Sequence, residues 1–134
     1  MAWTLDARLP LVIVEDAAGL ATALAIGPKA AVLAEAPPPL MPAEAAALAS
    51  FDASMPFHPG TGCACCGGRS PAAAALDRLF QARVRGACPW FEQVVALTET
   101  RAARDLVAAA LMDDAVTAAR FRPAAPPPPP SFIP

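Results

Sequence analysis

Short apolar runs alternate with longer alanine-rich segments along the chain, and this alternation predicts strands and helices in turn. Residues 10–15 (PLVIVE) predict a short buried strand, and residues 16–26 (DAAGLATALAI) predict a helix that a Gly-Pro pair ends. Residues 29–36 form a second run of strand length, and residues 43–51 (AEAAALASF) predict a short helix.

The clearest helix in the pattern spans residues 71–85. Ser70 is a suitable cap for it, and the proline that follows suits its first position. Its apolar residues recur at helical spacing and form one stripe: Leu76, Leu79, Phe80 and Val84. Farther along, residues 91–99 predict a strand, residues 101–114 a helix and residues 115–121 a last strand.

This alternation favours an α/β fold, a three-layer sandwich with a mainly parallel sheet. An all-helical fold stays open as an alternative, because periodicity alone does not separate alanine-rich strands from helices. The Val, Ile and Leu content of residues 10–15 and 93–97 favours the α/β fold. We expect residues 1–122 to form a single domain and residues 123–134 (PAAPPPPPSFIP) to form a proline-rich flexible tail.

The composition narrows the classes of function. The chain has 134 residues and a formal net charge of −2, and its few basic residues form no block. A nucleic-acid partner is therefore not expected. The start of the chain has no secretory pattern and no run is long enough to span a membrane, so we expect a cytoplasmic protein with no membrane partner. In a reducing compartment, clustered cysteines indicate metal or redox chemistry more often than disulfides.

Three of the four cysteines, Cys63, Cys65 and Cys66, fall within the stretch TGCACCGGRS. Thiolates bind Zn²⁺ and other thiophilic metals, and the helix that begins after this turn favours the thiolate form. Three sulfurs leave a tetrahedral site one ligand short. His58 or Glu35 is the candidate for the fourth ligand, and water or a partner protein are the alternatives. Glu35 ends the strand 29–36, so it lies at the same edge as the cysteine turn if the sheet is parallel.

Other interpretations of the cysteines remain. They are also compatible with small residues in a glycine-rich turn, and the spacing from Cys63 to Cys66 is compatible with a redox pair. Cys88 is separated from the cluster by the helix 71–85, about 22 Å long, and is expected at the opposite edge of a parallel sheet, where it packs.

The Gly-Cys-x-Cys-Cys motif before an amphipathic helix resembles the CobW-type metallochaperone GTPases, relatives of HypB and UreG. In that family the motif binds zinc or a related metal within a P-loop GTPase domain. Residues 9–24 are similar to the family's first strand, P-loop and first helix. Residues 30–37 are similar to a strand that ends in Asn-Glu in the family and in Ala-Glu35 here, and residues 94–103 to a strand that ends in Glu-Thr-Thr-Gly.

The chain departs from this family where nucleotide would bind. The P-loop pattern would fall on residues 14–21, where only Gly19 matches. Leu20 stands at the lysine position and Ala21 at the position of the magnesium-binding hydroxyl. We therefore expect a shortened copy with a degenerate P-loop that binds no nucleotide and hydrolyses no GTP.

The sequence thus predicts a non-catalytic, pseudo-GTPase module that binds zinc or another thiophilic metal and assists or regulates metal handling. The resemblance implies a protein partner, such as a full-length relative or a metal client. One alternative is an interaction or assembly factor whose cysteines are incidental, with the proline-rich tail as its docking segment. Another is an atypical GTP-binding metallochaperone.

Overall fold

Five strands form one sheet in the order β3-β2-β4-β1-β5. The structure, a computed structural model, describes residues 7–54 and 70–124. The strands are β1 (Leu9–Val14), β2 (Ala30–Glu35), β3 (Ala45–Phe51), β4 (Gln93–Leu97) and β5 (Phe121–Pro123). All four pairings between neighbouring strands are parallel, so the predicted α/β fold with a mainly parallel sheet is confirmed.

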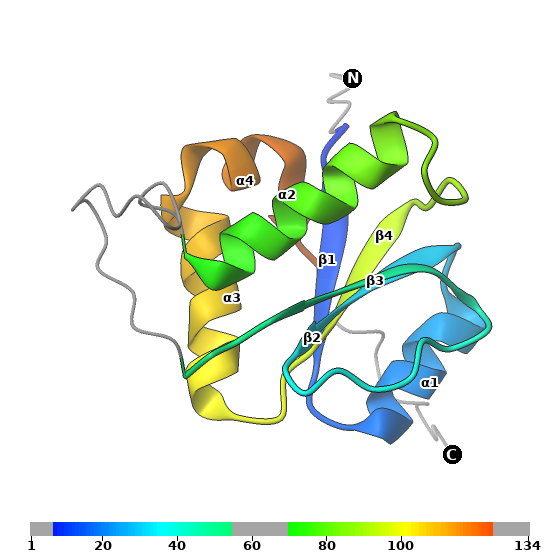
Figure 1. Cartoon of the computed structure of the whole chain (residues 1–134), viewed down its shortest axis with the longest axis horizontal. Coiled ribbons are helices and arrows are strands. Elements are labelled where there is room, and N and C mark those ends of the chain that lie inside the picture. The colour runs from blue at the N-terminus through cyan, green and yellow to red at the C-terminus, as the bar shows by residue number, and fades with distance from the viewer. Residues whose placement is uncertain (1–6, 55–69, 125–134) are drawn as a thin grey trace, which may run out of the picture.

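In the part of the chain that the structure describes, four helices accompany the sheet (Figure 1). They are α1 (Ala17–Ile26), α2 (Pro71–Val84), α3 (Arg101–Asp113) and α4 (Ala115–Arg120). Each begins after a side chain that accepts a hydrogen bond from a backbone N–H of the first turn: Asp16, Ser70, Thr100 and Asp114. The predicted cap at Ser70 is thus confirmed. Within the described ranges, none of these helices combines the length and the apolar character needed to cross a membrane.

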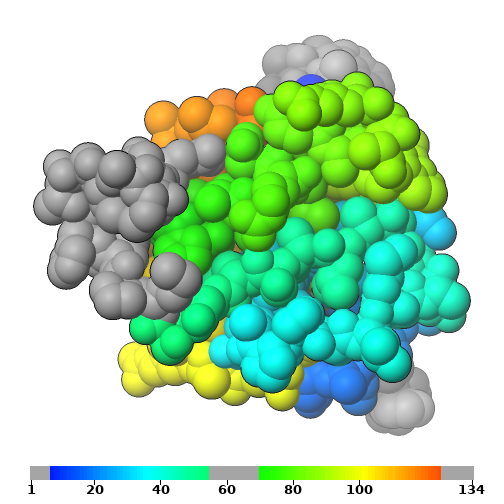
Figure 2. Space-filling model, viewed as in Figure 1, coloured from blue at the N-terminus to red at the C-terminus, as the bar shows by residue number. Residues whose placement is uncertain are grey.

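The helices lie on both faces of the sheet, which gives the predicted three layers. In Figure 1, α2 lies above the strands and α1 below them. Leu20 and Ala23 of α1 pack on β2 and β4 in one apolar cluster, whereas α2 and α3 pack on the other face in a larger one. Figure 2 shows β3 at the surface, as expected for the strand at one edge of the sheet.

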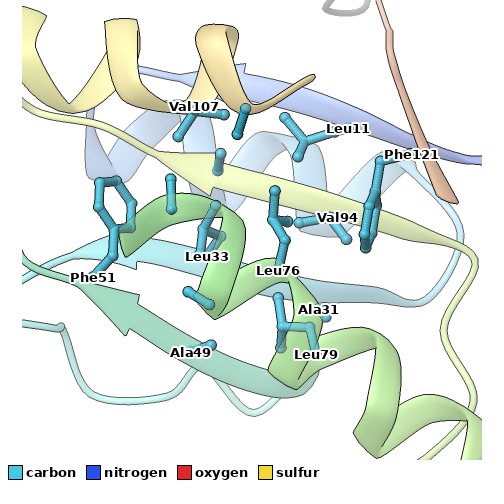
Figure 3. Close-up of a cluster of buried hydrophobic side chains, with 14 of the residues drawn as sticks. Leu11, Ala31, Leu33, Ala49, Phe51, Leu76, Leu79, Val94, Val107 and Phe121 are labelled. Atoms are coloured by element: carbon cyan, nitrogen blue, oxygen red, sulfur yellow. The ribbon is translucent and has the colours of Figure 1, made fainter. Parts of the chain in front are cut away.

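Small and large apolar side chains alternate in the main core (Figure 3). Leu76 of α2 points toward Leu33 and Val94 of the sheet, Leu79 lies by Ala31, and Phe121 lies at the β5 end of the core. Three buried alanines of α2 contribute no bulk beyond a methyl group: Ala72, Ala73 and Ala75. The alanine-rich composition therefore lets α2 approach the sheet closely, and a few leucines fill the space that remains.

The prediction of a helix at residues 43–51 is wrong, because residues Ala45–Phe51 form β3. Alanine and glutamate favour a helix in isolation. A helix here, however, would leave β2 at the edge of the sheet, with backbone groups of a buried strand unpaired. In the structure β3 pairs with β2 from Ala30↔Ala45 to Glu35↔Phe51, and the paired backbone outweighs the helix propensity.

The prediction of a strand at residues 115–121 is also wrong, because residues Ala115–Arg120 form α4. Asp114 starts this helix, since its Oδ2 accepts hydrogen bonds from the Thr117 N–H (2.9 Å) and the Thr117 hydroxyl (2.7 Å). Only Phe121 of the predicted strand lies in β5. Pro123, which the sequence places in the tail, pairs with Leu11 and belongs to the sheet.

Leu76 provides a test of this core. Leu76 is fully buried on α2, whereas Val84, on the same helix, is 53% exposed. We expect Leu76→Ala to lower the free energy of unfolding by about 2–5 kcal/mol, because it removes buried methyl groups and leaves a cavity. Val84→Ala should change it by less than about 0.5 kcal/mol. Urea denaturation followed by circular dichroism measures both, and equal effects would contradict this packing.

Candidate functional site at the carboxyl edge of the sheet

The carboxyl ends of four strands meet at one edge of the sheet because the strands are parallel. Leu97 of β4 lies beside both Val14 of β1 and Ala34 of β2, and Glu35 lies beside Phe51 of β3. Ligands of open α/β sheets bind at this edge, in the loops that follow the strands. This edge, here called the carboxyl edge, brings together several polar side chains.

Glu35, at the end of β2, accepts three hydrogen bonds from the start of α3. Its Oε1 accepts from the backbone N–H groups of Glu99 and Thr100, the latter at 2.8 Å. Its Oε2 accepts from the Thr100 hydroxyl at 3.0 Å. A carboxylate at a helix N-terminus also interacts favourably with the helix dipole. Glu35 is therefore held firmly, and it joins β2 to the β4–α3 loop.

The Thr100 hydroxyl takes part in two hydrogen bonds at once. Its hydroxyl donates to Glu35 and accepts a hydrogen bond from the Ala103 N–H at 3.1 Å, which caps α3. This contact joins the ends of two stretches that carry the family resemblance, 30–37 and 94–103. The sequence predicted the position of Glu35 at this edge but not Thr100 as its partner. A threonine just before a helix is a capping signal, and this signal identifies Thr100 in retrospect.

Three other acidic residues of the edge also have structural partners. Glu15 forms an ion pair with Arg104 at 3.1 Å, and the Asp16 Oδ1 accepts from the Gly19 N–H at 2.7 Å. Asp52 accepts from the Ser54 N–H and hydroxyl at 2.9 and 2.6 Å, and these bonds lower the pKa of the Asp52 carboxyl. Within residues 7–54 and 70–124, no three His, Cys, Asp or Glu side chains come together as metal ligands would.

The turn between β1 and α1 bears on the prediction of a degenerate P-loop. Only Glu15 and Asp16 separate the two elements. A phosphate loop presents backbone N–H groups to the ligand, but here the Asp16 carboxylate already binds the N-terminus of α1. The turn thus places negative charge where the family would hold phosphate.

The predicted ligands Cys63, Cys65, Cys66 and His58 lie outside the described residues. The described residues on either side of their segment lie at the carboxyl edge. Phe51 ends β3 beside Glu35, and its carbonyl oxygen accepts from the Ala36 N–H at 2.7 Å. Ser70 begins α2, which is tied to the end of β3 by a hydrogen bond from the Arg78 guanidinium to the Ser50 carbonyl at 2.8 Å.

Cys88 lies far from this edge, in the loop before β4. It is a free, half-buried thiol packed against the main core, in agreement with the prediction that it packs at the opposite edge. In the last turn of α2, the Arg83 guanidinium lies 3.5 Å from the centroid of the Trp90 ring and donates to the Phe91 carbonyl at 2.7 Å. Partial burial lowers the pKa of Arg83. The Arg83 contacts tie Trp90 and Phe91 of this loop to the end of α2.

Comparisons of the chain with protein-family models, curated protein sequences and solved structures find no match. The resemblance to CobW-type GTPases therefore remains a prediction from the motifs.

The cap formed by Glu35 can be tested by stability measurements. We expect Glu35→Gln to lower the free energy of unfolding by about 1–2 kcal/mol, because it weakens the charge-assisted bonds to the start of α3. Glu99→Gln is the matched control, since its side chain is exposed at the same edge and only its charge is lost. Thr100→Ala should lower the free energy of unfolding by about 1 kcal/mol.

The double variant Glu35→Gln/Thr100→Ala tests whether the two residues act together. The double variant should lose less free energy of unfolding than the two single variants lose in sum, because both substitutions break the same contact. Urea titrations at pH 7 measure all four proteins. A loss for Glu99→Gln as large as that for Glu35→Gln would show that general charge, rather than this cap, determines the effect.

Proposed function

We propose that the chain is a non-catalytic metal-binding module, with Zn²⁺ or another thiophilic ion held by Cys63, Cys65 and Cys66 at the carboxyl edge. The observation that carries this proposal is the position of the flanking residues. The end of β3 and the start of α2, which flank the cysteine segment in sequence, lie at the edge where Glu35 lies.

Chain geometry limits how far the thiols can be from this edge. Cys66 precedes Ser70 by four residues, so their Cα atoms are within about 14 Å of each other even in a fully extended chain. Cys63 and Cys65 are close neighbours of Cys66 in sequence. We propose that the three thiols gather there, near the N-terminus of α2.

The N-terminus of α2 differs from those of the other described helices. Asp16 and Asp114 cap α1 and α4 with carboxylates, and Glu35 binds the start of α3. By contrast, the described cap of α2 is the neutral Ser70 hydroxyl, which accepts from the Ala73 N–H at 3.1 Å. Its positive end therefore favours thiolates in the residues that precede it, and thiolate is the form that binds metal.

Glu35 is the described candidate for the fourth ligand. Its Oε2 accepts one described hydrogen bond, from Thr100, so a lone pair of this oxygen remains for a metal. Carboxylates that bind metals are commonly oriented by such bonds. His58, water or a partner protein remain alternatives. A site with three protein sulfurs and an exchangeable fourth ligand suits a protein that delivers metal or regulates its delivery to a client or a full-length relative.

The main test is the metal content of the reduced protein. We expect about one zinc per chain after anaerobic purification, measured by elemental analysis, because three thiolates and one further donor complete a tetrahedral site. Cys65→Ser should lose this zinc. Cys88→Ser is the matched control and should retain it, since Cys88 packs at the opposite edge of the sheet. Metal-free wild-type protein that takes up no added zinc would refute the proposal.

A second measurement tests Glu35 as the fourth ligand. We expect Glu35→Gln to weaken zinc binding about tenfold or more, as determined by competition with a chromogenic chelator. Glu99→Gln should change it far less, because it removes a charge from the edge but no ligand. Similar affinities for the two variants would exclude Glu35 and leave the alternatives named above.

A further inference from the structure

Helix α1 is unusual among the described helices because it carries no charged side chain. A helix on the surface of a globular protein normally presents charged or polar residues to water. The exposed residues of α1 are instead apolar except for Thr22: Ala17, Ala18, Ala21, Thr22, Ala25 and Ile26. Ile26 is 63% exposed. The outer face of α1 therefore has the composition of a helix that another segment covers.

A groove runs beside this face, between α1 and the connection that leads from β2 to β3. Its volume is about 290 Å³, and five apolar residues of α1 line one wall, Leu20 and Leu24 among them. Pro42 and Glu44 line the other. In the same connection Leu40 is 94% exposed and Met41 is 51% exposed, which extends the apolar surface beyond the groove. Figure 2 shows this connection (cyan) close to α1 (blue).

We infer that residues 125–134 of this chain, APPPPPSFIP, bind over α1 and fill this groove. The segment has no charged residue, and it carries two large apolar side chains, Phe132 and Ile133. Its five consecutive prolines favour an extended form whose ordering costs little entropy. Apart from Glu44, the groove is lined by alanine, leucine and proline, which are complementary to such a segment.

The position of the last described residue supports this occupant. The Ala124 N–H donates to the Leu11 carbonyl at 2.9 Å, so the chain still runs beside β1, toward the end from which α1 starts. The far wall of the groove leads into β3, at the other edge of the sheet. Four strand spacings, about 19 Å, separate β5 from β3. Ten residues in polyproline form span about 31 Å, which is enough to cross α1 and reach the groove.

Hydrogen exchange of the α1 amides in the full chain tests this inference. We expect removal of residues 125–134, or Phe132→Ala alone, to speed exchange of these amides about tenfold, because α1 loses the cover of a large apolar side chain. Ser131→Ala is the matched control in the tail and should leave exchange unchanged. Unchanged α1 exchange after removal of the segment would overturn the inference.

A variant in the groove separates docking from a general loss of stability. Ala21→Glu places a charge in the groove, and Thr22→Glu places one on the same exposed helix outside its lining. Ala21→Glu should speed α1 exchange in the full chain, yet add little once residues 125–134 are removed. Additive effects would overturn the inference.

A dimer in light scattering that becomes a monomer on truncation would also overturn the inference, since the segment would then bind a second copy. None of these readouts depends on the cysteines or on zinc.

Discussion

The parallel pairing of all the described strands is the constraint on which the rest of the structure depends. Each connection must return to the amino end of the sheet, so every strand finishes at the same edge. Glu15, Glu35, Asp52 and Glu99, which are distant in sequence, therefore lie at one edge as neighbours of the strand ends. The same constraint sends Cys88 to the opposite edge and so separates it from the cysteine segment.

The sequence predicted the elements whose signals are local. The Ser70-Pro71 start and the leucine stripe of α2 needed no information from the rest of the chain. Residues 45–51 and 115–120 were assigned wrongly because their structure depends on distant or easily missed partners. The alanine-rich 45–51 is a strand because β2 offers it a backbone to pair with, and propensity alone does not contain that pairing.

The candidate site, like the fold, was predicted from the sequence only in part. A parallel sheet places Glu35 at the carboxyl edge, and this much followed from the sequence. Its bonds to the N–H and hydroxyl of Thr100 did not, because they join residues that are 65 positions apart and depend on the order of β2 and β4 in the sheet. The caps formed by Asp16 and Asp114 are local, and a closer reading of capping signals would have identified both.

Charge at the carboxyl edge connects the fold with the proposed metal site. Several carboxylates close together repel one another, and the fold offsets this repulsion with helix N-termini, to which Asp16 and Glu35 bind, and with Arg104, which binds Glu15. Each of these helix N-termini, and Arg104, therefore already binds a carboxylate. Since α2 starts with a neutral serine, its dipole is the one described helix dipole to which no described carboxylate is assigned. Thiolates in the preceding segment would receive this stabilisation, and a divalent cation bound by them would also reduce the repulsion among the neighbouring acids.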